Sequence, residues 1–494
     1  MTRVRGSFFP PIALDVRAER PLYRQLYDWY QQAILEGRLR PGQRVPSTRS
    51  LAQELKLSRI PVITAYEQLH SEGYLETFKG AGTAVAAAIP RDAFSPAKPV
   101  SDARKGKPRA SRRLRQVMAL PPDLNAETLG IFRVSLPALD HFPSDIWASL
   151  VARHARNPCR LALAYGGPMG HLPFREAIAE YLGAARGVRC DASQVMVVSG
   201  SQHGLSIITR ALLDPGDAVW MEEPGYPGAH RAFMMADVRP VGVPVDQNGL
   251  MVEEGIRRSD HARAAYITPS HQYPLGMTMS AARRMMLLNW AAKRRAWIIE
   301  DDYDSEYRFG SRPLGAVQGM DQGDRVIYVG TFSKVLFPSL RVGYLVIPRD
   351  LVPLFSMARD ALDLFPSVLF QKALADFIRE GHFARHIRRM RMLYMGRREI
   401  LVEALTAALG QSVEVVSADA GMHLVCLLPH GINDRRLCAR AVEAGISLIP
   451  LSTCYLGKPN RPGLVMGYGG TDRKDIETGV LRLAQILRTA KTHR

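Results

Sequence analysis

Short apolar segments alternate with helical periods over residues 116–494, and this alternation limits the possible folds more than any other feature. The apolar segments are Val195–Ser199, Ala218–Met221, Ala265–Thr268, Ala296–Glu300, Val326–Gly330 and Val342–Ile347. Strands joined through helices pair in parallel, because each crossover brings the chain back to the same edge of the sheet. The pattern therefore predicts an α/β domain with a mostly parallel central sheet.

Residues 1–87 follow a different pattern. Apolar residues recur at helical spacing over Pro21–Glu36, and Ser47 is a suitable N-cap for a short second helix. A third helix is expected over about Arg59–Glu72. Two strands, Tyr74–Phe78 and Thr83–Val85, flank a glycine-bearing basic tip and predict a β-hairpin. This order of elements predicts a winged helix-turn-helix.

Positive charge is concentrated in the first part of the chain. Residues 1–115 contain 21 Lys and Arg against 10 Asp and Glu, in a chain of 494 residues with net charge +18. Residues 88–115 are rich in Pro, Ser, Arg and Lys, which predicts a flexible basic linker. A basic N-terminal module is typical of a nucleic-acid binder.

The remaining composition indicates the compartment. The sequence contains no run of about 18 apolar residues, so we expect no membrane span. The N-terminus is not followed by the apolar region of a signal peptide, so we do not expect one. The five cysteines are scattered and form no Cys-x-x-Cys pair, so we expect neither a disulfide framework nor a metal site. These features predict a cytoplasmic protein.

The end of the apolar segment Val326–Gly330 contains the most informative polar residues. Thr331, Ser333 and Lys334 follow the segment at once, and Arg341 comes seven residues after the lysine. An amine, small hydroxyls and a cation are what a pyridoxal phosphate (PLP) site needs, because PLP forms a Schiff base and carries a phosphate dianion.

Other strand ends contain compatible residues. Asp301 and Tyr303 follow an apolar strand, where a carboxylate could hold the pyridine nitrogen protonated and a tyrosine could bond the ring hydroxyl. The acidic run also suits a hard cation or a solvated loop, so it does not decide alone. Ser201 and Gln202 open a helix whose N-terminus suits phosphate, and Tyr226 lies in a tight loop from which it could stack on a ring.

Taken together, these residues resemble known families. The positions that resemble the GntR-type DNA-binding domain are Pro46, Ser47, Arg49, Leu51, Ala52, Leu55, Ser58, Arg59, Leu69, Gly73, Gly80, Gly82 and Thr83. The later segments, in this order, resemble fold-type I PLP aminotransferases, and the fusion resembles the MocR family, which includes the PdxR and GabR types. The resemblance implies an α/β aminotransferase fold type I domain, with a mostly parallel central sheet, behind an N-terminal winged helix-turn-helix. The implied domains are 1–87, the linker 88–115, and 116–494.

The resemblance also implies residue roles. Lys334 would form the Schiff base, and Asp301 would face the pyridine nitrogen, with Asp302 as the alternative. The other implied cofactor residues are Tyr303 and His271 at the ring hydroxyl, Tyr226 stacked on the ring, Ser201, Gln202, Ser333 and Arg341 at the phosphate, and Tyr165 reaching the neighbouring subunit's cofactor. The implied contacts to double-stranded operator DNA are Ser47, Arg49, Ser58, Arg59, Thr64, Lys79, Gly80 and Thr83.

Three departures from these families matter. Val465 stands where aminotransferases have the arginine that binds the substrate carboxylate, and Gly228 stands where the GabR type has an arginine. Ile60-Pro61 replaces the small polar residues usual at the start of the recognition helix. We therefore expect little or no transaminase turnover, and a homodimeric transcription regulator whose effector is PLP or a PLP adduct with an amino acid or amine.

Three alternatives remain open from the sequence. The chain could be an active aminotransferase with a DNA-binding arm, or a DNA-binding protein whose aminotransferase fold only dimerises. The winged helix could also serve protein contacts alone.

Overall fold

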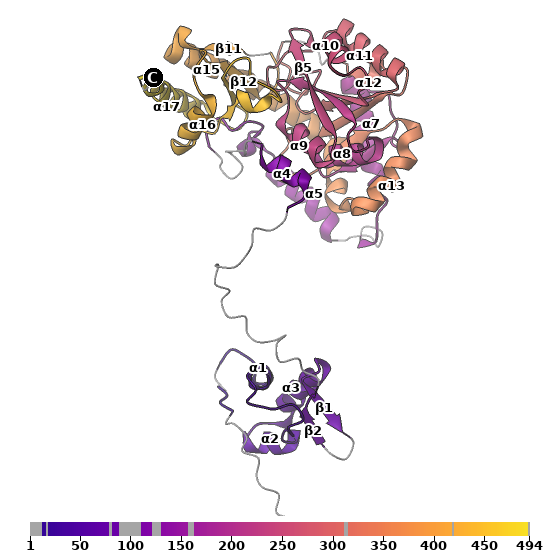
Figure 1. The fold of residues 1–494 in the computed structure, drawn as a ribbon, viewed down its shortest axis with the longest axis vertical. Coiled ribbons are helices and arrows are strands. Elements are labelled where there is room, and N and C mark those ends of the chain that lie inside the picture. The colour runs from indigo at the N-terminus through magenta and orange to yellow at the C-terminus, as the bar shows by residue number, and fades with distance from the viewer. Residues whose placement is uncertain are drawn as a thin grey trace, which may run out of the picture. The chain divides into compact units, whose positions relative to one another are not determined.

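The computed structural model describes residues 12–15, 18–78, 82–87, 110–120, 130–156, 163–310, 315–416 and 419–492. The chain divides into two compact units, Met1–Arg109 and Ala110–Arg494 (Figure 1). Within the described ranges, none of the helices combines the length and apolar composition that a bilayer crossing requires.

The first unit has the predicted winged-helix elements. They are α1 (Leu22–Leu35), α2 (Thr48–Glu54), α3 (Arg59–Ser71), β1 (Leu75–Phe78) and β2 (Gly82–Val85). The strands pair antiparallel, with Phe78 opposite Gly82. The three predicted helices and the predicted hairpin are therefore confirmed.

Local signals set the ends of these elements, and a small core joins them. The Ser47 hydroxyl accepts a hydrogen bond from the Ser50 amide at 3.1 Å and so caps α2. Gly73 follows α3 with φ +78°, a left-handed conformation that glycine adopts without strain. Leu26, Val62 and Leu69 are fully buried between the helices, as expected from the apolar stripe of α1.

The predicted linker ran to residue 115, whereas the structure begins helix α4 at Arg112 (Arg112–Met118). The Ser111 hydroxyl accepts from the Leu114 amide at 3.2 Å, which caps α4. Arg112 donates to both carboxylate oxygens of Asp237, at 2.8 and 3.0 Å. This pair ties the end of the predicted linker to the second unit, while residues 88–109 lie outside the described residues.

An eight-stranded sheet forms the centre of the second unit. Its order is β3-β10-β9-β8-β7-β4-β5-β6, and the pairs β9–β8, β8–β7, β7–β4 and β4–β5 are parallel. The strands are β3 (Val195–Val198), β4 (Ala218–Glu223), β5 (Arg239–Asp246), β6 (Gly249–Leu250), β7 (Ala264–Ile267), β8 (Trp297–Asp302), β9 (Val326–Thr331) and β10 (Gly343–Val346). All six predicted strands are present, and the mostly parallel sheet is confirmed.

Helices cover both faces of this sheet, so the unit has three layers. They include α5 (Ser144–Arg156), α7 (Leu172–Arg186), α8 (Ser201–Leu212), α9 (Pro227–Met235), α10 (Val252–Ser259), α11 (Ala281–Arg294), α12 (Val317–Met320), α13 (Val352–Asp363) and α14 (Val368–Arg379). Alternate residues of one strand pack on opposite faces. Val219 and Met221 contact the side of α8 and α9, while Trp220 between them stacks on Trp290 of α11 at 3.8 Å.

A C-terminal subdomain follows the central sheet. Its four-stranded antiparallel sheet has the order β11-β12-β14-β13. Its elements are α15 (His382–Leu409), β11 (Glu414–Val416), β12 (His423–Leu427), α16 (Asp434–Glu443), β13 (Ile449–Pro450), β14 (Gly463–Gly467) and α17 (Arg473–Thr492). Leu401, Leu424 and Leu483 join its helices and sheet in one buried core.

Candidate functional site

A cavity of about 140 Å³ lies at the carboxyl ends of β7, β8 and β9. Ligands of parallel α/β sheets bind at this edge, because the loops there converge while the strands hold them apart. The lining residues are Ser135, Ser201, Gln202, Tyr226, Tyr266, Thr268, Tyr273, Asp301, Tyr303, Thr331, Ser333, Lys334, Pro338 and Arg341. Eight of the ten predicted cofactor residues are therefore brought together.

Lys334 follows β9 and is half-buried beside the cavity. Burial lowers the pKa of its amine to about 8, because the ammonium loses its hydration. The Asp301 and Asp304 carboxylates act in the opposite direction, and they keep the pKa from falling further. A substantial fraction of this amine is neutral near physiological pH, which is the form that attacks a carbonyl.

Asp301 and Asp302, the two candidates for the pyridine nitrogen, differ in their surroundings. Asp302 is bonded by Arg186 Nε at 2.8 Å and by the Tyr328 hydroxyl, and both carboxylate partners are buried. Asp301 lines the cavity, where its Oδ2 accepts from the Tyr266 hydroxyl at 2.6 Å. Its Oδ1 is buried without a hydrogen-bond partner, and burial raises the pKa of the carboxyl to about 7. A bound N–H group would satisfy this oxygen.

Small hydroxyls and one guanidinium also line the cavity. Ser201 and Gln202 begin α8, so backbone N–H groups and the positive end of a twelve-residue helix face this region. Gly200 has φ +100°, and a Cβ at this position would lie 3.3 Å from the Arg341 guanidinium. The glycine thus lets Arg341 approach the helix start, where it can pair with a phosphate.

Aromatic side chains form the walls. Tyr226 precedes α9 and accepts from Gln202 Nε2 at 3.3 Å, and its ring meets the edge of Tyr273 at 5.6 Å. Tyr303 lines the cavity near Tyr273. Tyrosine rings placed this way can contact a flat heteroaromatic ligand.

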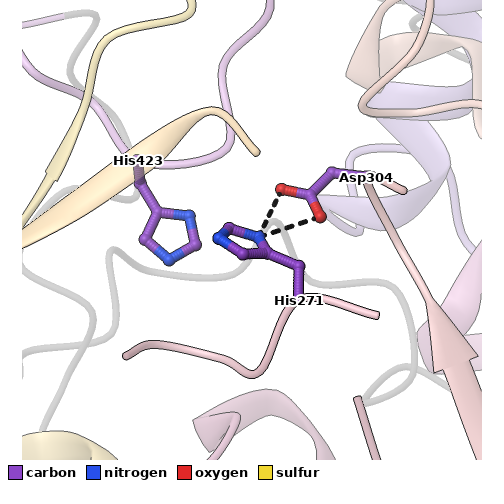
Figure 2. Close-up of side chains that lie close together, drawn as sticks. All are labelled: His271, Asp304 and His423. Atoms are coloured by element: carbon purple, nitrogen blue, oxygen red, sulfur yellow. Dashed lines mark hydrogen bonds and ion pairs between the residues drawn. The ribbon is translucent and has the colours of Figure 1, made fainter. Parts of the chain in front are cut away.

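Two predicted residues lie elsewhere. We expected His271 at the ring hydroxyl, but its buried side chain points to Asp304 (Figure 2). It also bonds to the Tyr303 hydroxyl, and it does not line the cavity. Tyr273 of the same loop lines the cavity instead. Tyr165 is 85% exposed and does not line the cavity of its own chain.

Several lining residues were missed by the sequence analysis. They are Ser135, Tyr266, Thr268, Tyr273 and Pro338. Tyr266 gave a usable signal, because a tyrosine inside an otherwise small apolar strand needs a buried partner for its hydroxyl. Ser135 gave none, since it comes from a loop almost 200 residues before Lys334.

The arginines predicted to contact DNA belong to α2 and α3 of the first unit. Arg20 and Arg24, at the start of α1, pair with Asp28. Arg49 and Arg59 are exposed, and among the described residues no carboxylate pairs with either of them. Unpaired arginines on a helix-turn-helix are available to phosphates or to guanine.

The other predicted DNA residues lie around the same helices. Ser47 and Ser58 are exposed at the starts of α2 and α3, and the Ser58 side chain makes no capping bond. The Thr64 hydroxyl donates back to the Ile60 carbonyl at 3.1 Å, and Thr83 lies opposite Thr77 across the hairpin. Ile60 is 73% exposed in the first turn of α3. Lys79 and Gly80 lie outside the described residues.

Comparison with known proteins identifies both units. Residues 22–85 match the family of bacterial regulatory proteins of the gntR type, and residues 140–478 match aminotransferase class I and II. Fold and cavity thus define a DNA-binding regulator joined to a domain of the PLP-dependent aminotransferase class.

Relatives along almost the full length narrow this class. The chain is 42% identical to the "Probable rhizopine catabolism regulatory protein MocR" of Rhizobium meliloti, over 95% of this chain and 94% of that protein. It is 31% identical to the pyridoxine biosynthesis transcriptional regulator PdxR of Corynebacterium glutamicum, over 94% and 96%. The chain belongs to the MocR-type family of helix-turn-helix transcription regulators with an aminotransferase-like domain.

Solved structures support the fold and the cofactor class. The kynurenine aminotransferase of Pyrococcus horikoshii, in complex with PMP, has a TM-score of 0.69 and 29% identity, covering 78% of this chain and 95% of that chain. LysN of Thermus thermophilus, complexed with a phosphopyridoxyl-leucine, has the same TM-score and 28% identity, over 78% and 96%. Pyridoxal phosphate is the cofactor of this domain class, and the lysine, the free Asp301 oxygen and the Arg341 end fit it.

Proposed function

We propose that this regulator binds PLP covalently at Lys334 and that PLP changes its affinity for operator DNA. The observation that supports this proposal is the combination of three groups in one cavity. They are the Lys334 amine with its lowered pKa, the Asp301 oxygen without a hydrogen-bond partner, and the Arg341 guanidinium near the start of α8. The unpaired arginines of the winged helix support the other half of the proposal, which is binding to double-stranded DNA.

The residues of the cavity have distinct proposed tasks. Arg341, Ser333 and the start of α8 hold the phosphate dianion, and Tyr226 orients the ring. Asp301 would keep a proton on the pyridine nitrogen, and Lys334 would supply the amine to which the PLP aldehyde binds. When bound, PLP supplies an electrophilic aldehyde and an electron-withdrawing ring.

The surroundings of the cavity favour a sensor over a transaminase. Val465 is fully buried in an apolar cluster of β14, so it offers no group to a substrate carboxylate. A Cβ at Gly228 would lie 2.4 Å from Gln202 Nε2 and 2.4 Å from the Tyr226 ring, so a larger side chain there would require these two side chains to move. Arg461 is paired with Glu414 at 2.5 Å. None of these three positions offers a substrate carboxylate an available guanidinium.

We further propose that the regulator acts as a cytoplasmic homodimer. The exposed Tyr165 ring, supported by Phe365 at 5.9 Å, would complete the cofactor cavity of the partner. Binding that favours one dimer arrangement over another would couple the cavity to the winged helices.

The test measures binding to the DNA upstream of the protein's own gene, with PLP-free and PLP-loaded protein at one salt concentration. A change in affinity or footprint on loading supports the proposal, and Lys334→Ala should lose that change while still binding DNA. Equal binding in both states, with PLP demonstrably attached, refutes PLP alone as effector, and amino acids and amines are then added to the loaded protein. Sustained turnover of an amino acid with a keto acid would favour the active aminotransferase instead.

A further inference from the structure

A hydrogen-bonded group lies directly behind Tyr303, outside the cavity lining. His271 Nδ1 is 3.1 Å from each carboxylate oxygen of Asp304 (Figure 2). The same nitrogen is 3.0 Å from the Tyr303 hydroxyl. The Tyr303 hydroxyl is also 3.0 Å from the His271 carbonyl oxygen, to which it donates. The His271 and Asp304 side chains are each 2% exposed.

The partners determine where the protons lie. The Asp304 carboxylate can only accept, so Nδ1 must carry the proton that lies between them. The same N–H also faces the Tyr303 oxygen, while the tyrosine proton points to the His271 carbonyl. Tyr303 is therefore held at two points by one residue, and Asp304 holds that residue in the required tautomer.

The C-terminal subdomain closes against the same histidine. Gly421, with φ +84°, lies so near that a Cβ would come within 2.0 Å of His271 Cε1. His423 of β12 lies with its ring centre 5.1 Å from that of His271, and its Nε2 donates to the Pro274 carbonyl at 3.0 Å. Burial lowers the pKa of His423 to about 3, so a neutral ring packs here. These contacts leave His271 little freedom to rotate.

We infer that His271 and Asp304 are positioning residues for the Tyr303 hydroxyl. The His271 N–H holds the Tyr303 oxygen in place, and when PLP binds the tyrosine proton turns from the His271 carbonyl to the ring hydroxyl oxygen of PLP. This inference rests on the proposed binding of PLP in the cavity. Asp304, which follows Asp301, Asp302 and Tyr303 in the sequence, thus supports the cavity wall through His271.

A metal ion is the competing occupant of this group. His271, Asp304 and His423 offer ligand atoms that all lie within 4.8 Å of one another. However, His271 Nδ1 is already bonded to Asp304 and Tyr303, and His423 Nε2 to Pro274. The hydrogen bonds account for the geometry, so we favour the positioning role.

The test compares two amides at position 271 in the full chain. His271→Asn puts an N–H near the place of Nδ1, whereas His271→Gln puts it near the place of Nε2. The readouts are the pKa of the visible absorbance of bound PLP, the PLP dissociation constant and the unfolding midpoint of PLP-free protein. Tyr303→Phe is the reference, because it removes the donated hydrogen bond outright.

Loss of a hydrogen bond to the ring oxygen disfavours its ionised form, so Tyr303→Phe should raise the pKa of bound PLP. His271→Gln should raise it too and weaken PLP binding by about three- to tenfold, the range for one hydrogen bond. His271→Asn should stay within about twofold of wild type. Asp304→Asn, which leaves Nδ1 facing a neutral partner, should shift the pKa in the same direction and serves if His271→Gln does not fold.

Three outcomes would overturn the inference. The first is a shift for Tyr303→Phe with none for His271→Gln or Asp304→Asn. The second is equal behaviour of the two amides, which would reduce His271 to packing. The third is a stoichiometric divalent ion in the purified chain whose removal by EDTA shifts the same pKa. Absence of any PLP absorbance in the wild type would instead refute the proposed function itself.

Discussion

Covalent capture of PLP should follow the ionisation of a buried amine. The Lys334 pKa of about 8, against an ordinary 10.5, makes the neutral fraction at pH 7.5 about a quarter instead of about one in a thousand. At that pH roughly two hundredfold more of the amine is in the reactive neutral form than for an ordinary lysine of equal access, so capture should be faster. Because neutral amine accumulates as pH rises through the pKa, the rate should increase up to about pH 8 and then level off.

The carboxylate of Asp301 allows a second test of the Lys334 pKa. Asp301 raises the pKa of Lys334, so Asp301→Asn should lower it further and move the midpoint of the rate profile to lower pH. Rates are measured by stopped-flow absorbance from pH 6.5 to 9.5 and checked by borohydride fixation and mass spectrometry. Reaction of PLP with Nα-acetyl-lysine in the same buffers corrects for the ionisation of PLP.

Lys334→Arg is the matched control, since it keeps a cation but has no reactive amine, and it should show no capture at any pH. A corrected rate that climbs steadily through pH 9.5 would refute the depressed pKa. A midpoint that moves to higher pH in Asp301→Asn would refute the assigned cause.

Three further predictions concern DNA binding and stability. Arg49→Ala should weaken binding to the upstream DNA and flatten the slope of log affinity against log salt by about one unit, as for a lost phosphate contact; an unchanged slope in a salt titration would exclude that contact. Ile60 is exposed in the first turn of α3 and should contact a thymine methyl. Replacing that thymine of the footprint by uracil should lower the affinity of the wild type about fourfold and leave the affinity of Ile60→Ala almost unchanged. Equal losses at every thymine would contradict this contact. Arg186→Leu should leave the buried Asp302 carboxylate without its cation and lower the free energy of unfolding in urea by roughly 3–5 kcal/mol. Arg294→Ala, which removes an exposed ion pair, should lower it by under about 1 kcal/mol. Similar losses in both variants would count against the role of burial.

The sequence predicted those parts of the fold that local pattern determines. Strands such as β9 are continuous apolar runs that end in small polar residues, and both features are visible without partners. The C-terminal sheet was missed because β11 has three residues and β13 two, one of them proline, so long-range pairing alone makes them strands.

The site was predicted to a similar depth. Position along a strand placed Asp301 and Lys334 at the correct edge, because strand ends converge there. Side-chain direction within a loop is not visible in sequence, which is why His271 was expected in the cavity that Tyr273 lines. Helix α4 begins within the predicted linker, and the sequence analysis did not expect it, because the basic composition of this segment outweighed the capping signal of Ser111.

The crowding at Gly228 and the apolar packing of Val465 have a consequence for what such a receptor reports. A protein that converts its ligand follows how fast the ligand is supplied, because each turnover removes what was detected. Restoring a carboxylate clamp here would need an arginine where a Cβ already meets Tyr226, or one inserted into a sealed apolar cluster. Either substitution requires neighbouring side chains to move, so under the proposed function a single mutation does not readily turn the receptor into an enzyme. The fraction of receptor with bound PLP then follows the steady-state concentration of PLP.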